Sequence, residues 1–477
     1  METFSNMIRV LASRLPVPSG LGLVTIATAV CVLAGCRGVS AGNEAALREA
    51  LAAKSRVIHL APGVMEVSAP IEVPEGAQDL EIRGDPAGST LRAADGFQGR
   101  AVLVVRGGHK VHFADFSIDG NRRVLERPVE LPPSNVTFAE FYGNNGIVAV
   151  DTESLAVENV RFSEIANYAI IVSGGSGAVI EGVEVRYSGS RNEHNRNNAS
   201  GGILVENGAE SFTVRECRLE NIRGNGIWTH SRYESPRNSK GRIVGNRFSH
   251  IGRDAIQVGH ATLIRVEGNS GSHIGFPLEE VDVEGGAMPV AIDTAGNTDQ
   301  SSYVGNEWRE VNGKCIDLDG FHHGEVRENT CTNREAAAAY PSGHFGIVMN
   351  NSNPDMESEQ IVVEGNEISG MVYGGIYVIG SGHRISGNRL LHLNKAACRQ
   401  GSADPRCNYW PQEPALLRSG IYLGSRAERP AVTRDNLIEG NEISGFGMAA
   451  GCVAVSPGAE AAANQIRANQ CREEAAP

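Results

Sequence analysis

The residues best suited to chemistry are gathered in one short stretch, KCIDLDGFHHGEVREN, at positions 314–329. The nine residues 317–325 include three with a carboxylate and two with an imidazole: Asp317, Asp319, His322, His323 and Glu325. Paired carboxylates can act as acid and base on a glycosidic bond, and carboxylate oxygens also bind Ca²⁺. Ile316 and Leu318 alternate with the aspartates, as in a strand with one polar face. The chemistry of this stretch therefore depends on which residues lie beside it in the folded chain.

A repeated phrase predicts those neighbours. It combines a small residue, an isoleucine, any residue, an apolar residue and a polar turn, as in NGIVAVD, DAIQVGH, VAIDTAG and KCIDLDG. Its copies centre on Ile147, Ile170, Ile203, Ile227, Ile256, Ile292, Ile316, Ile347, Ile376, Ile421 and Val453. Period-two alternation excludes helix, and a minimum spacing of 23 residues with variable insertions predicts a coiled backbone with loops at chosen corners.

A second phrase places an asparagine after Gly, Glu or Ala and before a short polar–apolar run. Its copies contain Asn246, Asn269, Asn306, Asn329, Asn366, Asn388, Asn441 and Asn469. Asparagine tolerates left-handed backbone and can form hydrogen bonds along a stack of identical turns. Short strands, regular corners and no intervening helices predict an all-β protein, a parallel β-helix.

The two phrases resemble the repeats of right-handed parallel β-helices of the pectate-lyase-like superfamily. The stretch EAALREALAAKSRVIHLAPGVMEVSAPIEVP also resembles the start of that superfamily, a short capping helix followed by the first coils. The resemblance covers roughly residues 44–471 and implies a single domain over 44–477, with roughly 11–13 coils. It does not identify the chemistry, because this fold hosts lyases, hydrolases, epimerases and non-catalytic adhesins.

Residues 1–35 are predicted to be a lipoprotein signal peptide. Arg9 and Arg14 precede an apolar run of 13 residues, 21–33, which is short for a membrane span. The run ends in Leu-Ala-Gly-Cys36, which resembles the bacterial lipobox, so Cys36 is the expected lipidated N-terminus and 36–43 a tether. An ordinary cleaved signal peptide and a membrane anchor are the alternatives. The expected location is the bacterial cell envelope, and the non-acidic Arg37 favours the outer membrane over the inner one.

Composition narrows the class of partner. A net charge of −13 argues against nucleic acid and against a basic membrane-surface role, so the membrane is expected to be contacted through the lipid only. The protein is expected to be a monomer. Beyond Cys31 and Cys36 seven cysteines remain, an odd number that suggests three bridges and a buried thiol in an oxidising envelope. The predicted pairs are Cys398–Cys407, Cys452–Cys471 and, less strongly supported, Cys315–Cys331, which leaves Cys217 as the thiol.

Alignment of the first phrase on its isoleucine predicts which side chains share the outer face of one sheet. The residue after the isoleucine should point outward, and this column includes Trp228, Gln257, Asp293, Asp317, Tyr377 and Tyr422. Because stacked strands are about 4.8 Å apart, Asp293 and Asp317 are expected on adjacent rungs. Two opposed like charges cost about 0.2–1 kcal/mol and tend to hold a proton. Such a pair therefore indicates function rather than stability.

The surroundings of this pair predict a groove for sugar rings. Asp319, His230 and Asn350 occupy the next outward position, His260 lies at the turn, and Lys314 and Arg253 begin neighbouring rungs. Aromatic platforms are expected about 10 Å from the pair on both sides, from Trp228 on one side and from Tyr377 and Tyr422 on the other. The basic loop at 230–242 suggests an acidic polysaccharide, although a merely solvated loop is the favoured explanation.

Three functions follow from this pattern. Asp293 followed by Asp317 and Asp319 resembles the polygalacturonase family in count and order, but the second pair is Asp-x-Asp, and the Gly-His-Gly and Arg-x-Lys signatures of that family are missing. The first hypothesis is a glycoside hydrolase without a cofactor, in which Asp293 and Asp317 share the acid and base roles. In a polysaccharide lyase or C5-epimerase, Asp293, Asp317 and Asp319 would bind Ca²⁺, and Lys314, Arg253 or a histidine would take the proton. In a non-catalytic carbohydrate-binding solenoid, insertions would scatter the acidic residues.

The lipobox generates the first prediction. Replacing Cys36 by Ala removes the lipid attachment site, so the mature protein is expected to move from the membrane to the soluble fraction on cell fractionation. Unchanged membrane association of Cys36→Ala would contradict the lipid anchor.

Overall fold

The structure, a computed structural model, describes residues 38–475 except 129, 193–199, 233–234, 282–287, 400, 409–412, 414 and 450. The chain divides into a unit of residues 1–39 and a unit of residues 40–477. The predicted signal peptide, with Cys36, lies outside the described residues. No helix within the described ranges is long and apolar enough to span a membrane.

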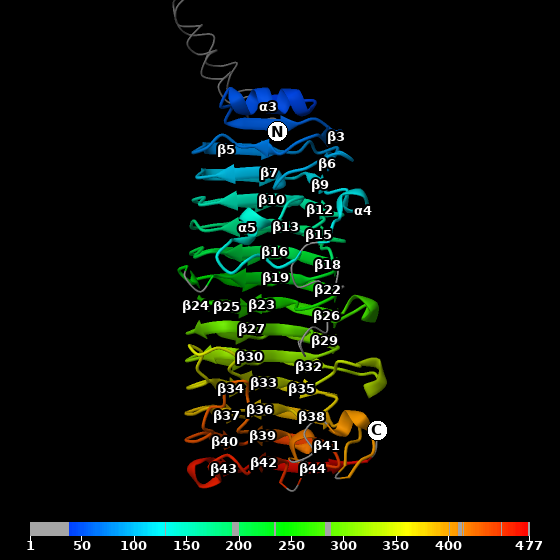
Figure 1. The fold of residues 1–477 in the computed structure, drawn as a ribbon, viewed down its shortest axis with the longest axis vertical. Coiled ribbons are helices and arrows are strands. Elements are labelled where there is room, and N and C mark those ends of the chain that lie inside the picture. Colours follow the sequence, from blue (N-terminus) through cyan, green and yellow to red (C-terminus); the bar gives the residue numbers. More distant parts are fainter. Residues whose placement is uncertain are drawn as a thin grey trace, which may run out of the picture. The chain divides into compact units, whose positions relative to one another are not determined.

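The strands of the second unit form three sheets whose neighbouring strands run parallel (Figure 1). The first sheet contains β1 (Val39–Ala41), β2 (Val57–Leu60), β5 (Gln78–Arg83), β8 (His109–Ala114), β11 (Ala156–Glu158), β14 (Val179–Glu181), β17 (Thr213–Arg215), β21 (Arg242–Val244), β25 (Arg265–Glu267), β28 (Ser302–Val304), β31 (Glu325–Arg327), β34 (Val362–Glu364), β37 (Arg384–Ser386), β40 (Leu437–Glu439) and β43 (Gln465–Arg467). The second, called the site sheet, contains β4 (Ile71–Glu72), β7 (Ala101–Arg106), β10 (Asn145–Val150), β13 (Tyr168–Ser173), β16 (Gly201–Glu206), β19 (Asn225–His230), β23 (Ile256–Val258), β27 (Val290–Asp299), β30 (Lys314–His322), β33 (Ile347–Asn350), β36 (Ile376–Val378), β39 (Ile421–Leu423) and β42 (Val453–Val455), with β20 (Asn238–Ser239) and β24 (Ala261–Thr262) off the main path. The third contains β3 (Gly63–Val67), β6 (Ser89–Ala93), β9 (Ser117–Asp119), β12 (Arg161–Ser163), β15 (Glu184–Arg186), β18 (Arg218–Ile222), β22 (Arg247–Ile251), β26 (Ser270–Ile274), β29 (Glu307–Val311), β32 (Thr330–Thr332), β35 (Glu367–Ser369), β38 (Arg389–Leu393), β41 (Glu442–Phe446) and β44 (Gln470–Glu474).

Each coil contributes one strand to each sheet. The chain passes from β10 in the site sheet to β11 in the first sheet and β12 in the third, and β13 then returns to the site sheet one rung further on. Of the 15 strands assigned to the site sheet, β20 and β24 lie off the main path, which leaves 13 rungs. Eleven of these carry the isoleucine phrase, and Ile71 and Leu103 continue the same column in β4 and β7. The predicted parallel β-helix, with its coil number and register, is confirmed.

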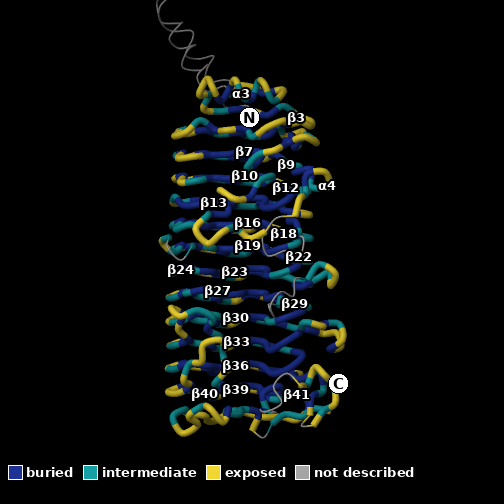
Figure 2. Tube along the Cα trace, in the orientation of Figure 1, coloured by how far each residue is buried: buried dark blue, intermediate teal, exposed yellow. Residues whose placement is uncertain are grey.

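The inward column of the repeat forms the core. Ile147, Ile170, Ile203, Ile227 and Ile256 pair one above another, and each is fully buried in a single long apolar cluster. Figure 2 shows the strands buried along the length of the coils, while exposed residues gather at turns and loops. Burial of these branched side chains stabilises each coil only when a neighbouring coil covers it.

Among the residues that the structure describes, helices are few and lie outside the coils. They are α3 (Glu44–Ala52), α4 (Arg122–Leu125) and α5 (Phe138–Phe141), with the 3₁₀ turns η1 (Leu278–Glu280), η3 (Ala337–Ala339), η4 (Pro405–Asn408), η5 (Leu416–Arg418) and η6 (Ala461–Ala463). Helix α3 begins where the Asn43 side chain accepts a hydrogen bond from the Ala46 amide, and it buries Leu47, Ala50 and Leu51 against the first coil. It covers the N-terminal end of the solenoid, as the resemblance implied (Figure 1).

The asparagine phrase forms a continuous ladder between the first and third sheets. The Nδ2 group of each asparagine donates to Oδ1 of the asparagine one coil further on, at 2.8–2.9 Å, from Asn246 through to Asn469. The ladder satisfies buried polar groups at a corner where the backbone turns away from its own sheet. The predicted stacking of identical turns is confirmed.

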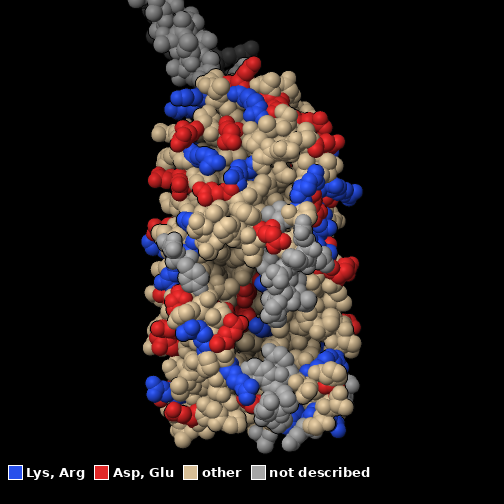
Figure 3. Space-filling view, viewed as in Figure 1, with Lys and Arg blue, Asp and Glu red and all other residues tan. Residues whose placement is uncertain are grey.

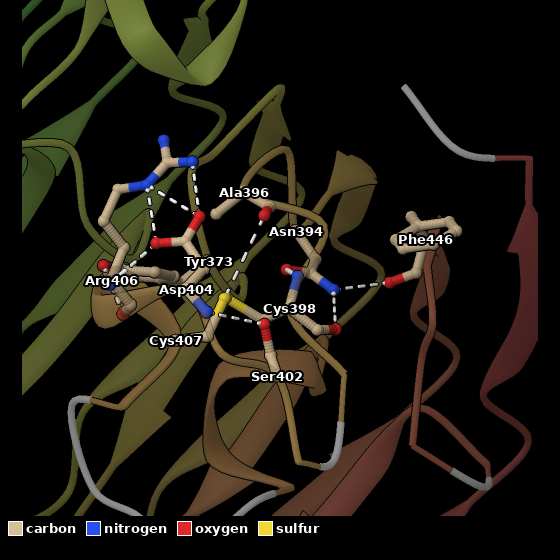
Figure 4. Close-up of a disulfide and its surroundings, with 9 residues drawn as sticks. All are labelled: Tyr373, Asn394, Ala396, Cys398, Ser402, Asp404, Arg406, Cys407 and Phe446. Carbon is tan, nitrogen blue, oxygen red and sulfur yellow. Dashed lines mark hydrogen bonds and ion pairs between the residues drawn. A yellow bond between two sulfur atoms is a disulfide. The ribbon is translucent and has the colours of Figure 1, made fainter.

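Three disulfides join the predicted cysteines: Cys315–Cys331, Cys398–Cys407 and Cys452–Cys471. Cys217 is buried and is the free cysteine of the described part of the chain. Figure 4 shows Cys398–Cys407 closing its loop, which the Tyr373 hydroxyl ties to the solenoid by donating to the Arg406 carbonyl at 2.9 Å. The disulfide therefore closes the loop on itself, and the Tyr373 hydrogen bond ties it to the coils.

The ladder generates the second prediction. Asn329→Ala removes the acceptor of the Asn306 amide and side chain, and the donor to the Tyr303 carbonyl. Because each buried group left without a partner costs about 1–3 kcal/mol, the free energy of unfolding should fall by about 3 kcal/mol.

Asn469→Ala, at the partly exposed end of the ladder, is the matched control. Water can replace its partners, so its loss in melting temperature should be less than half as large. Equal losses in a thermal unfolding experiment would contradict a role for burial.

Candidate active site

The site sheet aligns the predicted outward column in register. Gln257 pairs with Asp293, Asp293 with Asp317, and Asp317 with Val348 across β23, β27, β30 and β33. The prediction that the two aspartates occupy adjacent rungs is confirmed. Figure 3 looks onto this face and shows a hollow at the level of β27 and β30, with acidic and basic side chains on its floor.

Asp293 is nearly buried and held by a chain of amides. It is 8% exposed, and its Oδ2 accepts a hydrogen bond from Gln257 Nε2 at 2.9 Å. The Gln257 Oε1 atom in turn accepts from Asn225 Nδ2 at 2.8 Å. Burial raises the pKa of Asp293 well above its ordinary value, and the nearby charges of Asp254 and Asp317 act in the same direction. Asp293 therefore retains its proton well above the usual range of an aspartic acid.

Asp317 differs from Asp293 because it has a cationic partner. Its Oδ2 forms an ion pair with Lys314 Nζ, and both side chains are nearly buried. Burial opposes the charge of Lys314, but the attraction of Asp317, with smaller contributions from Asp293 and Asp319, raises the Lys314 pKa. Lys314 is therefore held as an ammonium group beside Asp317.

Asp319 lies two residues further along β30. The Ser352 amide donates to its Oδ1 at 2.8 Å, and the Ser352 hydroxyl donates to its Oδ2 at 2.5 Å. Burial and the charge of Asp317 raise the Asp319 pKa to about 6. Asn350, the other predicted residue at this position, pairs with Asp319 across β30 and β33.

A segment at 130–144, called the strap, crosses the outer face of the earlier rungs. Phe138 of the strap packs on Val148, Ile171 and Leu204, which together form a second apolar cluster. The amides of Phe138 and Ala139 donate to the buried carboxylate of Glu206, each at 2.9 Å. The strap therefore covers the outward column before the site begins.

The three aromatic rings predicted as platforms are buried, so the prediction that they are exposed is wrong. Trp228 is 8% exposed, because its ring packs edge-on against Phe138 with centroids 5.1 Å apart. Tyr377 and Tyr422 stack on each other at 6.1 Å and are 8% and 1% exposed. Their hydroxyls donate to the Arg426 carbonyl and to Glu413, both at 2.5 Å. The loops that fold back over these rings could not be read from the repeat.

The substrate-binding residues predicted on the earlier rungs meet in a cavity of about 360 Å³. Its walls include Trp228, His230, Arg253, Gln257 and His260. The rest of the lining consists of Arg232, Phe138, Asn225 and Ser231, with Leu131, Pro132, Pro133, Ser134 and Val136 of the strap. Because Gln257 also binds Asp293, the cavity adjoins the aspartate pair.

The two adjacent histidines lie apart from this cavity. His322 Nε2 is 3.0 Å from Asn297 Oδ1, and His323 lies 3.3 Å from Glu359. No group of three or more His, Cys, Asp or Glu is placed to hold a metal ion within the described ranges. Asp293, Asp317 and Asp319 therefore do not form the predicted calcium set, because Lys314 and Ser352 engage the latter two carboxylates.

Asp254, which is 1% exposed, belongs to the site although it was not among the residues predicted from the repeat. Its Oδ1 accepts from the Val290 amide at 3.0 Å, and its Oδ2 is 3.4 Å from Arg253 Nε. Burial raises its pKa to about 6, against the opposing charge of Arg253. Extending the alignment to two residues before the isoleucine would have found it, since Asp254, Val290 and Lys314 share that column. No sequence signal identified Ser352.

The unequal surroundings of the aspartate pair generate the third prediction. Asp293→Asn removes a carboxyl group that burial and the charges of Asp254 and Asp317 hold protonated, which costs folding free energy at pH 7, while an amide oxygen still accepts from Gln257, so the melting temperature at pH 7 should hold or rise. Asp317→Asn leaves the Lys314 ammonium without its ion-pair partner, which should cost about 3 kcal/mol of unfolding free energy.

Thermal unfolding of the two variants under identical conditions checks this difference. The Lys314 ion pair revises the expectation from sequence, in which Asp317 is only a source of repulsion. Equal destabilisation by both substitutions would show that the Lys314 ion pair does not distinguish them.

The comparisons with known proteins agree with this architecture. Residues 133–286 match the family model described as a right handed beta helix region. A search of curated proteins found no match. Among solved structures, the chain is similar to the Dettilon tailspike protein gp208, with a TM-score of 0.52 and 14% identity over 88% of this chain. It spans only 66% of the tailspike chain.

Two further structures are similar at the same level. One is PfbA, a surface adhesin of Streptococcus pneumoniae, with a TM-score of 0.53 and 12% identity over 75% of this chain and 92% of PfbA. The other is the catalytic domain of an alpha-1,3-glucanase in complex with tetrasaccharides, with a TM-score of 0.51 and 12% identity over 94% and 71% of the two chains. Identities this low show the fold alone. Together with the family match and the parallel sheets, they establish that this chain is a right-handed parallel β-helix.

Proposed function

We propose that this protein is a glycoside hydrolase that binds a polysaccharide or oligosaccharide over the outer face of the site sheet. The observation that carries the proposal is the in-register pair of Asp293 and Asp317, nearly buried on adjacent rungs in unequal surroundings. Two carboxyl groups whose surroundings separate their protonation states are the requirement for acid–base cleavage of a glycosidic bond.

The surroundings assign a role to each aspartate. Asp293 keeps its proton because it is buried beside other acidic groups, so it donates to the glycosidic oxygen as general acid. Asp317 is a carboxylate paired with Lys314, so it acts on the opposite side of the reaction, on water or on the anomeric carbon. Asp319, fixed by Ser352, adjusts the charge around Asp317.

The protonation state of Lys314 argues against the form of the lyase alternative in which Lys314 is the base. A lyase needs a neutral base to remove the C5 proton, but the raised pKa of Lys314 keeps it an ammonium group. A binding-only solenoid gives no reason to stack two like charges, and insertions do not separate this pair. The similar alpha-1,3-glucanase domain, which is described with bound tetrasaccharides, is consistent with a carbohydrate substrate.

The proposal includes the cell envelope as the site of action. Lipidation at Cys36 would tether the solenoid by residues 37–43, so the substrate would be a glycan at or near the cell surface.

The fourth prediction tests the activity. The full chain should release reducing ends from at least one member of a panel of neutral and acidic oligosaccharides, and Asp293→Asn and Asp317→Asn should each reduce kcat by 100-fold or more, on the order of general acid–base catalysis. Because Asp293 must be protonated, kcat/KM should fall as pH rises through its raised pKa, above the ordinary aspartate value of about 4.

Asp435→Asn is the matched control, since this exposed residue contacts Arg434 far along the chain from the pair. It should retain full activity. Turnover that survives both active-site substitutions would reject the acid–base assignment.

A further inference from the structure

The cavity beside Asp293 is basic although the protein is acidic. The chain has a net charge of −13, yet the described residues that line this cavity include no Asp or Glu. They include two arginines, Arg232 from the segment after β19 and Arg253 from the turn before β23. A concave site lined by cations favours a ligand with negative charge.

Both arginines are held in place by neighbouring groups. Arg232 Nη1 donates to the Asn135 carbonyl at 2.6 Å, and its Nη2 donates to Asn207 Oδ1 at 3.1 Å. The Arg253 side chain is 15% exposed and lies 3.4 Å from Asp254. A guanidinium fixed in this way loses little entropy when it binds an anion, which favours carboxylate and sulfate groups.

Two buried polar atoms in the lining have no partner among the described residues. They are Nε of Arg232 and Nδ1 of His230. Buried polar atoms in folded proteins almost always have a hydrogen-bond partner, so atoms without one in the wall of a cavity indicate a ligand or water there.

The remaining wall suits a sugar ring. Trp228 and Phe138 provide apolar surface, while His230, His260 and Gln257 provide hydrogen-bonding groups. Burial lowers the pKa of His230 to about 4, so its imidazole is neutral and can bond to a hydroxyl. The volume of about 360 Å³ lies within the usual range for small-molecule sites.

We propose that this cavity is the subsite for an anionic sugar unit, a uronate or a sulfated sugar, whose acidic group contacts Arg232 and Arg253. The inference rests on the proposed function and names the class of its substrate. Gln257 links the two sites, because it lines the cavity and donates to the proposed general acid. The sugar in the cavity is thus adjacent to the bond that Asp293 protonates.

Binding to the Asp293→Asn variant of the full chain tests the proposal without turnover. The probes are oligogalacturonate, oligoglucuronate, sulfated galacto-oligosaccharide and the neutral galacto- and gluco-oligosaccharides of equal length, measured by calorimetry. At least one anionic series should bind at least about tenfold more tightly than its neutral counterpart, and high salt should reduce that preference. The carboxylate and sulfate series show which acidic group the site takes.

Arginine variants test the assigned contacts. In the Asp293→Asn background, Arg232→Gln and Arg253→Gln should each weaken anionic binding about tenfold and leave neutral binding unchanged. Arg237→Gln is the matched control, because this arginine lies in the same basic loop but pairs with Asp299 and does not line the cavity. Arg253→Lys, which keeps the charge, should recover part of the affinity and excludes misfolding as the cause.

The outcomes separate the two proposals. Equal binding of neutral and anionic probes, no binding of any anionic probe, or insensitivity to both arginine substitutions would overturn the anionic subsite. If the wild type then cleaves a neutral glycan, the hydrolase stands without this subsite. If anionic probes bind through the arginines but no glycan is cleaved, the subsite stands and the hydrolase fails.

Discussion

The constraint on which the rest of the structure depends is the registered stacking of coils through the inward isoleucine column. A single coil leaves both edges of its strands unpaired and its isoleucine half-covered, so it is stable only between two others. Once Ile256, Ile292 and Ile316 are stacked, the residue after each is forced outward at a fixed height. The aspartates face each other for this reason, and the asparagine ladder fixes the same register at another corner.

A parallel sheet stacks identical positions, and this is both useful and costly for an active site. Like charges at equivalent positions repel, and burial beneath the surrounding loops strengthens the effect. In this protein the three aspartates have unequal partners, with amides beside Asp293, an ammonium group beside Asp317 and a serine beside Asp319. Equivalent positions thereby acquire different chemistry. The same inequality that limits repulsion supplies one protonated and one ionised carboxyl group.

The loops decide where the site begins and ends. The strap covers the rungs before it with Phe138, and the loops around Glu413 and Arg426 cover the tyrosines after it. Between them the outward face is hollowed over β27 and β30 (Figure 3). In a solenoid the coils supply regular positions and the insertions supply shape, so specificity depends on segments outside the repeat.

The sequence by itself determined the β-helix, the register of its rungs, the aspartate pair and the cysteine pairing. The first three follow from a pattern that repeats at the spacing of a coil, because side chains alternate across a strand and equivalent residues must stack. The cysteine pairs were predicted from the number and positions of the cysteines instead. Only the tertiary structure decided that Trp228, Tyr377 and Tyr422 are covered, that Asp254 and Ser352 belong to the site, and that Lys314 neutralises Asp317. The cover over the rings and the contact of Ser352 arise from loops of irregular length that fold back from distant positions, so no local pattern predicts where they lie. Asp254 and Lys314 stand in the repeat itself, two residues before the isoleucine, but their burial and their partners depend on the folded chain.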